Sequence, residues 1–401
     1  MSFRLIDLSR ALQLIAKMLF VAILLTGCGG GGSGSTTGAT QSSFTAGPIT
    51  GFGSVIVNGI RFDVSTATVA NDDDEAQSES DLKLGMLAEV EAGEITVDST
   101  GSHGNAKAIH FRSAIIGPVG AVDTTAKTLV VLGQPVDVTS TTVFDERLPA
   151  GLGSIAKGDV VEVFGMLNKT TGHYTAKRIA PKPNAPFFKL RGVVSNLDTV
   201  AHTFKIGSET ISYAGLAADQ VPADLANDLL VSVKLETAQV NGVWVATKLK
   251  DATRHMAEHD EAELRGLVTS VTSQTQFSVD GIAVDASRAQ FFPAGAIVAV
   301  GVEVEVEGTA SNGVIMATKV SIETEDDDEL AGFELHGAIS TLNTTTKTFV
   351  LRGVTVSYGG TAVVFKGGME SDLADGRRVE VKGTLSTDGT MLQATTIRFE
   401  H

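Results

Sequence analysis

The nine residues Thr348-Phe-Val-Leu-Arg-Gly-Val-Thr-Val356 form the clearest β-hairpin pattern in this 401-residue chain. Apolar and polar residues alternate with a period of two, which is typical of a strand with one buried face. The central Arg352-Gly353 pair predicts a tight turn, because two-residue hairpin loops need positive φ at their central positions. Similar patterns surround Gly133-Gln134 and Asp280-Gly281. We therefore predict antiparallel hairpins along the whole chain.

The chain is a tandem repeat of about seventy residues. A glycine opens an apolar-alternating segment at five places, spaced by 70, 75, 74 and 71 residues: Gly47, Gly117, Gly192, Gly266 and Gly337. A strictly alternating strand recurs later in the units, as in Val302-Glu-Val-Glu-Val-Glu-Gly308. Near the end of each unit an Ala precedes an aliphatic residue by three positions, as in Ala317-Thr-Lys-Val320. One structural unit is therefore repeated along the chain.

We expect five such units, since a single core stops growing well below this length. Their expected bounds are 46–112, 113–182, 187–253, 261–324 and 330–401. Each should contain five or six short antiparallel strands and one short helix or loop. Short strands protect their edges best by closing, so the predicted fold is all-β, with five tandem small β-barrels of the oligonucleotide/oligosaccharide-binding type. Two-sheet sandwich domains are the alternative. The polar or proline-containing connectors predict a separate core in each unit.

The N-terminus has the pattern of a bacterial export signal. Three basic residues precede an uninterrupted apolar run over 18–25, which is too short to span a bilayer. The following Leu25-Thr26-Gly27-Cys28 resembles the lipobox of bacterial lipoproteins and contains the only cysteine. The resemblance implies that 1–27 is a lipoprotein signal peptide and that Cys28 becomes acylated, with palmitate among the expected lipids.

Residues 28–45 are predicted to be a flexible tether between the lipid and the folded units. Gly, Ser, Thr, Ala and Gln account for the whole of 29–43, a composition without an apolar anchor. Gly29 rather than Asp follows the cysteine, which under the usual enterobacterial sorting pattern indicates the outer membrane. We expect a lipid-anchored protein that faces the periplasm or the cell surface.

The segment Gly47-Pro-Ile-Thr-Gly-Phe-Gly-Ser-Val-Ile-Val-Asn-Gly59, with Leu82-Lys-Leu-Gly-Met86 after it, resembles the bacterial repeat family called domain of unknown function 5666. The Val-Glu-Val-x-Gly and Ala-Thr-x-Val elements of later units resemble it too. The third unit departs most, with Leu230-Val-Ser-Val-Lys-Leu235 in place of the glycine-ended strand. The resemblance covers nearly all of 46–401. It implies exported, often lipid-anchored proteins of tandem β domains without an assigned activity, and it supplies no catalytic residues.

Composition and charge exclude several classes of function. The apolar fraction of 43% is enough to bury a core, whereas 47 acidic against 31 basic residues give a net charge of −16. Single-strand nucleic-acid binding needs a basic groove with stacking aromatic residues, and this chain has one Trp and three Tyr. We therefore expect no nucleic-acid partner. A single cysteine also excludes a disulfide within the chain.

The sequence has no G-x-S-x-G elbow, no P-loop, no paired-cysteine metal site and no dinucleotide fingerprint, so we expect a protein that is not an enzyme and has no cofactor. One string, His255-Met-Ala-Glu258-His259, fits the H-x-x-E-H pattern of zinc peptidases. On a helix it would place His255 and His259 on one face, with Glu258 as the base. Because the string falls in a charged connector, we expect a solvated linker and no metal site, with these three residues as weak candidates.

Two acidic runs are predicted to be solvated, with calcium binding as the alternative: Asp72-Asp73-Asp74-Glu75, and Glu323 with Glu325-Asp326-Asp327-Asp328-Glu329. Calcium needs six to eight converging oxygen ligands, and neither run has EF-hand spacing. The histidines at 103, 110, 173, 202 and 336 are isolated in the sequence and are assigned no role.

Two functions remain open at this stage. One is a non-catalytic cell-envelope lipoprotein of tandem β modules, with a structural or protein-interaction role. The other is a repeat protein that binds a glycan, a peptide or a divalent cation, with avidity from its tandem units. In both cases the expected partners are the membrane, through the lipid on Cys28, and an envelope protein or glycan.

Overall fold

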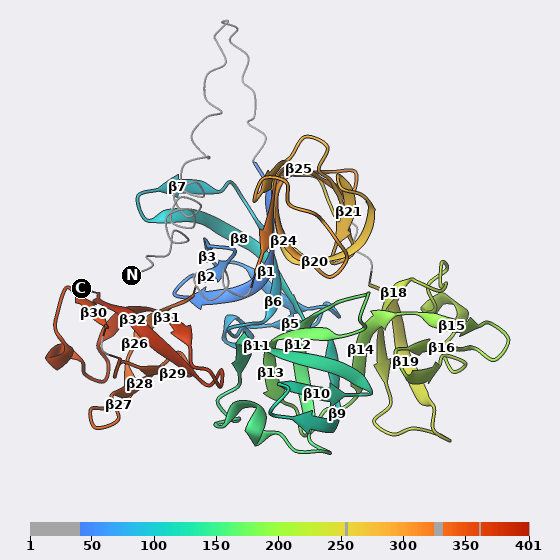
Figure 1. Ribbon diagram of the computed structural model, residues 1–401, viewed down its shortest axis with the longest axis horizontal. Coiled ribbons are helices and arrows are strands. Elements are labelled where there is room, and N and C mark those ends of the chain that lie inside the picture. Colours follow the sequence, from blue (N-terminus) through green and yellow to red (C-terminus); the bar gives the residue numbers. More distant parts are fainter. Residues whose placement is uncertain (1–40, 253–255, 325–331, 361, 401) are drawn as a thin grey trace, which may run out of the picture.

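The computed structural model describes residues 41–252, 256–324, 332–360 and 362–400. They form five small β-barrels in chain order: barrel 1 (Ser43–Arg112), barrel 2 (Ile115–Pro181), barrel 3 (Phe188–Asp251), barrel 4 (His259–Glu323) and barrel 5 (Phe333–Phe399). Barrel 1, coloured blue to cyan, lies among the other four (Figure 1). Cys28 and the predicted signal peptide and most of the tether lie outside the described residues.

The first two barrels contain thirteen strands. Barrel 1 has β1 (Ser43–Phe52), β2 (Val55–Val57), β3 (Ile60–Asp63), β4 (Thr68–Asn71), β5 (Ala76–Gln77), β6 (Leu87–Ala92), β7 (Thr96–Asp98) and β8 (Gly101–Arg112), with the 3₁₀ turn η1 (Glu79–Asp81). Barrel 2 has β9 (Ile115–Asp123), β10 (Thr128–Val131), β11 (Gln134–Phe144), β12 (Val160–Leu167) and β13 (Tyr174–Pro181), with η2 (Gly151–Ser154).

The other three barrels repeat this plan. Barrel 3 has β14 (Phe188–Val193), β15 (Ser195–Asp198), β16 (Thr203–Ile206), β17 (Glu209–Ser212), β18 (Leu230–Leu235) and β19 (Trp244–Asp251), with η3 (Ala218–Gln220). Barrel 4 has β20 (His259–Ser273), β21 (Gln276–Val279), β22 (Ile282–Asp285), β23 (Gln290–Phe292), β24 (Glu303–Ser311) and β25 (Val314–Glu323). Barrel 5 has β26 (Phe333–Ala338), β27 (Ser340–Asn343), β28 (Thr348–Leu351), β29 (Val354–Ser357), β30 (Val364–Lys366), β31 (Arg378–Leu385) and β32 (Met391–Phe399), with η4 (Glu370–Asp372).

Every barrel closes in the same strand order. In barrel 1, β1 pairs with β2, β2 with β3, β3 with β8, β8 with β6, and β6 with β1; only the β3–β8 pairing is parallel. Barrel 2 follows this order as β9-β10-β11-β13-β12, and barrel 4 as β20-β21-β22-β25-β24. In barrels 3 and 5 the first strand is split, into β14 and β15 and into β26 and β27. The predicted all-β fold of small barrels is confirmed, because each sheet closes on itself.

The hairpin turns have the geometry that the sequence predicts. Arg352 and Gly353 have φ of 49° and 79°, and Leu351 pairs with Val354 across the turn. Asp280-Gly281 is equivalent. In barrel 2 the turn residues are Leu132 and Gly133. The predicted Gly133-Gln134 turn is therefore wrong by one residue, because the glycine takes the second turn position, as it does in the other two hairpins.

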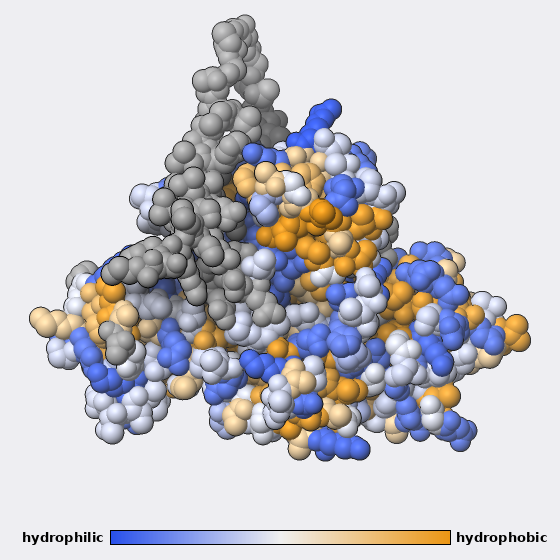
Figure 2. Space-filling view, in the orientation of Figure 1, coloured by the Kyte–Doolittle hydropathy of each residue, from blue (hydrophilic) through white to orange (hydrophobic). Residues whose placement is uncertain are grey.

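The short helix or loop expected in each unit is at most a single 3₁₀ turn in the described residues, as in η3 and η4. In the part of the chain that is described, no helix is both long and apolar enough to cross a membrane. The surface mixes polar and apolar residues, with an apolar area over barrel 4 (Figure 2). In barrel 4 the loop over 293–302 has no charged residue and carries Ile297, which is 73% exposed.

The expectation of a separate core in each unit is wrong. The β1 strand pairs in parallel with β20, from Ser43↔Glu261 to Ala46↔Leu264, and also with β26. A third pairing joins β9 to β14. One hydrophobic cluster contains buried side chains of barrels 1 and 5, and another contains those of barrels 2 and 3. The prediction rested on the polarity of the connectors, which does not determine whether the outer faces of the barrels pack against one another.

Candidate functional site

Barrel 1 makes polar contacts with each of the other four barrels. With barrel 2, the Leu84 carbonyl of barrel 1 accepts from Arg178 Nη1 at 3.3 Å, and with barrel 3, Asp73 of barrel 1 lies 2.6 Å from Lys248. Arg112 of barrel 1 pairs with Asp280 of barrel 4, and Arg61 of barrel 1 lies 2.8 Å from Glu334 of barrel 5. Strand residues of one barrel form these contacts, either with a strand of another barrel, as Arg61 does with Glu334, or with a turn, as in the contacts of Asp73, Leu84 and Asp280. Charged side chains that alternation predicts to face water are thus placed between barrels.

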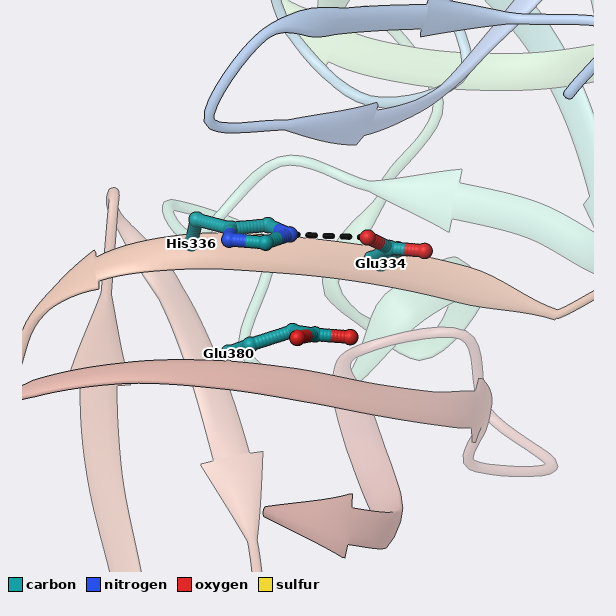
Figure 3. Close-up of side chains that lie close together, drawn as sticks. All are labelled: Glu334, His336 and Glu380. Carbon is teal, nitrogen blue, oxygen red and sulfur yellow. Dashed lines mark hydrogen bonds and ion pairs between the residues drawn. The ribbon is translucent and has the colours of Figure 1, made fainter. Parts of the chain in front are cut away.

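One of these interfaces gathers three side chains that have metal-ligating groups. Glu334, His336 and Glu380 offer ligand atoms that all lie within 4.8 Å of one another (Figure 3). Within the described ranges this is the one group of three such residues found. We call these three residues the barrel 5 cluster.

The barrel 5 cluster follows directly from strand geometry. Successive residues of a strand face opposite sides, so Leu335 is buried inside the barrel while Glu334 and His336 share the outer face of β26. In the adjacent strand β31, Glu380 lies opposite His336, and Lys382 lies opposite Glu334. The backbone register of two paired strands therefore fixes the cluster.

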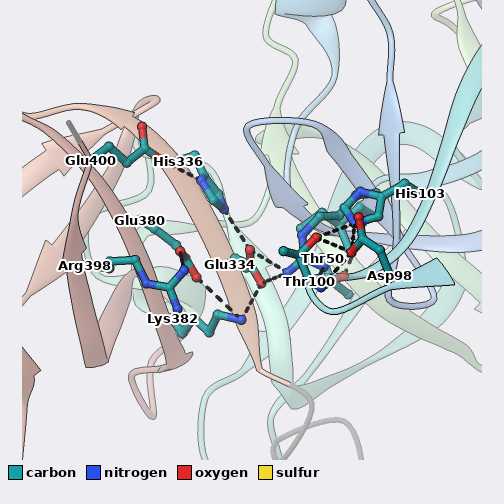
Figure 4. Close-up of polar contacts among 12 residues, drawn as sticks. Thr50, Asp98, Thr100, His103, Glu334, His336, Glu380, Lys382, Arg398 and Glu400 are labelled. Atoms are coloured by element: carbon teal, nitrogen blue, oxygen red, sulfur yellow. Dashed lines mark hydrogen bonds and ion pairs between the residues drawn. The ribbon is translucent and has the colours of Figure 1, made fainter. Parts of the chain in front are cut away.

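His336 lies between two carboxylates. Its Nε2 is 2.7 Å from Glu334 Oε1 and its Nδ1 is 2.8 Å from Glu400 Oε1 (Figure 4). Arg61 Nη2 of barrel 1 donates to both oxygens of Glu334, at 2.9 and 2.8 Å. Lys382 Nζ is 3.0 Å from Glu334 Oε2. The cluster is consequently part of the contact between barrels 1 and 5.

The charge states of this site follow from its hydrogen bonds. Burial alone would raise the pKa of Glu334, but hydrogen bonds from His336, Arg61 and Lys382 outweigh it and hold that pKa far below its usual range. Burial would lower the pKa of His336, but Glu334 and Glu400 outweigh burial and raise it. A salt-bridged imidazolium and a carboxylate are thus both favoured.

The first acidic run is solvated only in part: Asp74 and Glu75 are exposed as expected, whereas Asp72 and Asp73 are half-buried and pair with lysines. The carboxylate of Asp73 accepts from three lysines of barrel 3, with distances of 2.7 Å to Lys234, 2.6 Å to Lys248 and 3.1 Å to Lys250. Asp72 pairs with Lys189 of the same barrel. The acidic loop of barrel 1 therefore docks on a lysine-rich face. Calcium needs six to eight converging oxygens, whereas three ammonium groups surround the Asp73 carboxylate, so calcium coordination gains no support here.

The second acidic run begins with Glu323, whose side chain is only 4% exposed and lies 3.4 Å from Arg265. Glu323 is thus paired within barrel 4 instead of solvated. The remaining members of this run, 325–329, lie outside the described residues.

The His255-Met-Ala-Glu258-His259 string does not form a helix where it is described. Residues 256–258 have no regular structure, and His259 begins β20. Glu258 Oε1 accepts the backbone N–H of Asn312 at 2.9 Å, and the His259 ring lies 5.7 Å from that of Phe44. His255 is outside the described residues. The helical face that the zinc-peptidase pattern requires is therefore missing from the described part of the string.

The barrel 5 cluster was not predicted, because His336 is isolated from other histidines in the sequence. The available signal was the i, i+2 spacing of Glu334 and His336 in an alternating strand, which puts both on one face. Two other histidines that were assigned no role also have acidic neighbours: His173 Nδ1 is 3.0 Å from Asp137, and His103 Nε2 is 3.4 Å from Asp98.

Comparison with known proteins gives one family. A family model described as Domain of unknown function (DUF5666) matches residues 46–98, 116–180, 265–321 and 336–398. These stretches correspond to barrels 1, 2, 4 and 5, and the third unit is the one that departs most in sequence. No curated protein matches the chain. A solved structure titled "drosophila Unr CSD456" is 11% identical to this chain, and the match covers 54% of this chain and 98% of the solved chain. The TM-score of 0.14 is too low for any conclusion from this match.

Proposed function

This chain belongs to the family described as Domain of unknown function (DUF5666), and we propose that it is a non-catalytic lipoprotein of the bacterial cell envelope. In this proposal its five barrels form one body with a structural or protein-interaction role. The lipid on Cys28 holds that body to the outer membrane through the tether over 28–45.

The observation that carries the structural role is the joining of the barrels by shared strands. Strand β1 belongs to barrel 1 and also pairs with β20 and β26, and β9 pairs with β14. Continuous backbone pairing and shared hydrophobic clusters resist relative motion of domains far better than linkers do. Such a body suits a spacer or a platform for a partner, whereas modules that bind separately need freedom to move.

The charged interfaces support the same role. Outward-facing strand residues of several barrels form ion pairs with other barrels, as Arg61 does with Glu334 and Lys248 does with Asp73. Pairs that are partly buried and share hydrogen bonds fix the orientation of the groups they join. The charges of barrels 3 and 5 at these faces are therefore used for assembly of the chain itself.

The anchor gives a direct prediction. Cys28→Ser should leave the precursor unprocessed at the lipoprotein site and remove the protein from the salt-washed outer-membrane fraction, because acylation needs the thiol. Fractionation with mass spectrometry of the product measures this. Ser33→Ala, a change in the same segment that keeps Cys28, should behave like the wild type. Recovery of Cys28→Ser in the outer membrane at the wild-type level after a high-salt wash would exclude the anchor.

The interaction role is tested by capture from detergent-solubilised envelope with the full acylated chain as bait. The Cys28→Ser chain is the matched control, since it has the same folded body without the lipid. A partner of the folded body should be retained by both baits. Retention of nothing above blank resin by either bait, together with turnover of a substrate by the purified chain, would overturn the proposal.

A further inference from the structure

We propose that Glu334, His336 and Glu380 bind a divalent transition-metal ion of the zinc class on the outer face of barrel 5, where that face meets barrel 1. This site is independent of the proposed envelope role. It also differs from the His255 string in position and in ligands.

The first support is preorganisation. Two paired strands hold the three residues, with His336 directly opposite Glu380 and Glu334 two residues from His336. Sites on strands are positioned more accurately than sites on loops. Ligands of tetrahedral zinc lie roughly 3.3 Å apart, given metal–ligand distances of about 2.0–2.1 Å. Ligand atoms within 4.8 Å of one another can reach this spacing by rotation of the two glutamate side chains, without backbone movement.

The second support is the chemistry of the donor set. One imidazole nitrogen with two carboxylate oxygens suits zinc and its neighbours, whereas calcium needs six to eight oxygens. His336 also has the outer-shell partner that metal-bound histidines usually have. Its Nδ1 is 2.8 Å from the Glu400 carboxylate, an arrangement that orients the ring. On metal binding the ion would take the place of the proton between Nε2 and Glu334 Oε1, which are 2.7 Å apart, and that proton would be released to solvent. Glu400 is thus a positioning residue.

The third support is a cation that already lies between the two acidic ligands. Lys382 Nζ is 3.0 Å from Glu334 Oε2 and 3.6 Å from Glu380 Oε1. The side chain is 47% exposed, so it can rotate into solvent and leave its place to a metal ion. The two glutamates then keep a compensating positive charge, because the ion replaces the ammonium group. Arg61 can stay on the second oxygen of Glu334, and Arg398, whose Nη1 is 3.0 Å from Glu380 Oε2, can stay on the second oxygen of Glu380. The metal would then be coupled to the contact with barrel 1.

The test is calorimetric titration of the full mature chain with Zn²⁺ after chelator treatment. We expect one tight equivalent of Zn²⁺ and no binding of Ca²⁺. Glu400→Gln should weaken the affinity about 10- to 100-fold, as loss of an outer-shell partner does. His336→Gln with Glu380→Gln should abolish binding. Lys382→Met should strengthen it, because the competing cation is gone.

The controls separate this site from adventitious binding and from misfolding. His255→Ala with His259→Ala should leave the titration unchanged. Circular dichroism of the metal-free variants shows whether they fold. If the His336→Gln variant does not fold, the affinity of Lys382→Met for Zn²⁺ still tests the proposal. The proposal is overturned if the wild type does not bind Zn²⁺ stoichiometrically. It is also overturned if binding is lost in the His255→Ala, His259→Ala variant but kept in the His336→Gln, Glu380→Gln variant.

Discussion

Glu303→Gln is expected to lower the free energy of unfolding of the full chain by about 3–5 kcal/mol, the usual cost of removing one partner of a buried ion pair. Glu303 accepts from Lys177 of barrel 2 at 3.1 Å and from Arg265 Nε at 3.0 Å. The side chains of Lys177 and Arg265 are only 5% and 8% exposed. The substitution therefore removes a carboxylate charge that two buried cations share.

The charge of Glu303 is secure in the folded protein. Burial alone would raise its pKa, but Lys177 and Arg265 outweigh burial and lower it. The glutamate is thus ionised at neutral pH, and Gln keeps the shape while it deletes the charge. Glu323 would remain 3.4 Å from Arg265, but the contact of barrels 2 and 4 would lose the carboxylate that Lys177 and Arg265 share.

Urea unfolding followed by circular dichroism measures this effect. Glu307→Gln is the matched control, since Glu307 is on the same strand β24 and pairs with Lys319 but is 40% exposed. Exposed pairs contribute about 0–1 kcal/mol, so the control should lose little stability. An equal loss in both variants would show that the position of Glu303 between barrels has no special importance.

The sequence was sufficient to predict the interior of each barrel. A period of two identifies the inward residues, such as Phe349 and Val356, and both are buried. The turn pair Arg352-Gly353 fixes the hairpin, because few residues adopt positive φ at both turn positions. Strand closure followed from the need to protect short edges. These rules are local, and local rules can be applied to a sequence alone.

The outer faces could not be predicted in the same way. Alternation shows that Glu334 and Lys234 point away from their own barrels. It does not show whether such a charged side chain is surrounded by water or contacts a neighbouring barrel. The partners Arg61 and Asp73 are separated from them by 273 and 161 residues. No local pattern records such a pairing, so the acidic loop was expected to be solvated and the cores to be separate.

Asp73→Asn should weaken the contact of barrel 3 with barrel 1, at a cost of about 2–4 kcal/mol in the stability of the full chain. The Asp73 side chain is 10% exposed and accepts from three lysines. Its loss leaves Lys234, Lys248 and Lys250 in mutual repulsion. We place the cost below the full value for buried pairs because Lys248 is 41% exposed and solvent screens part of the repulsion.

The pH dependence follows from the same contacts. Burial would raise the pKa of Asp73, but the hydrogen bonds from the three lysines outweigh it and hold the pKa well below the usual value of about 3.9. A depressed folded-state pKa means stability that is complete above about pH 4 and is lost as the pH falls towards the folded-state value. The difference between wild type and Asp73→Asn should therefore be constant from pH 5 to 7 and shrink below about pH 4.

Urea unfolding across this pH range, with limited proteolysis of the connector after Lys182, measures both effects. The exposed neighbour Asp74 has no lysine partner among the ion pairs found for this loop, so Asp74→Asn is the control and should change stability by no more than about 0.5 kcal/mol. Added salt should narrow the gap only modestly, because partly buried pairs are screened less than exposed ones. If Asp73→Asn and Asp74→Asn unfold alike at pH 7, the Asp73 carboxylate does not hold barrel 3, and the Asp72–Lys189 pair and the joined β9 and β14 strands must position it.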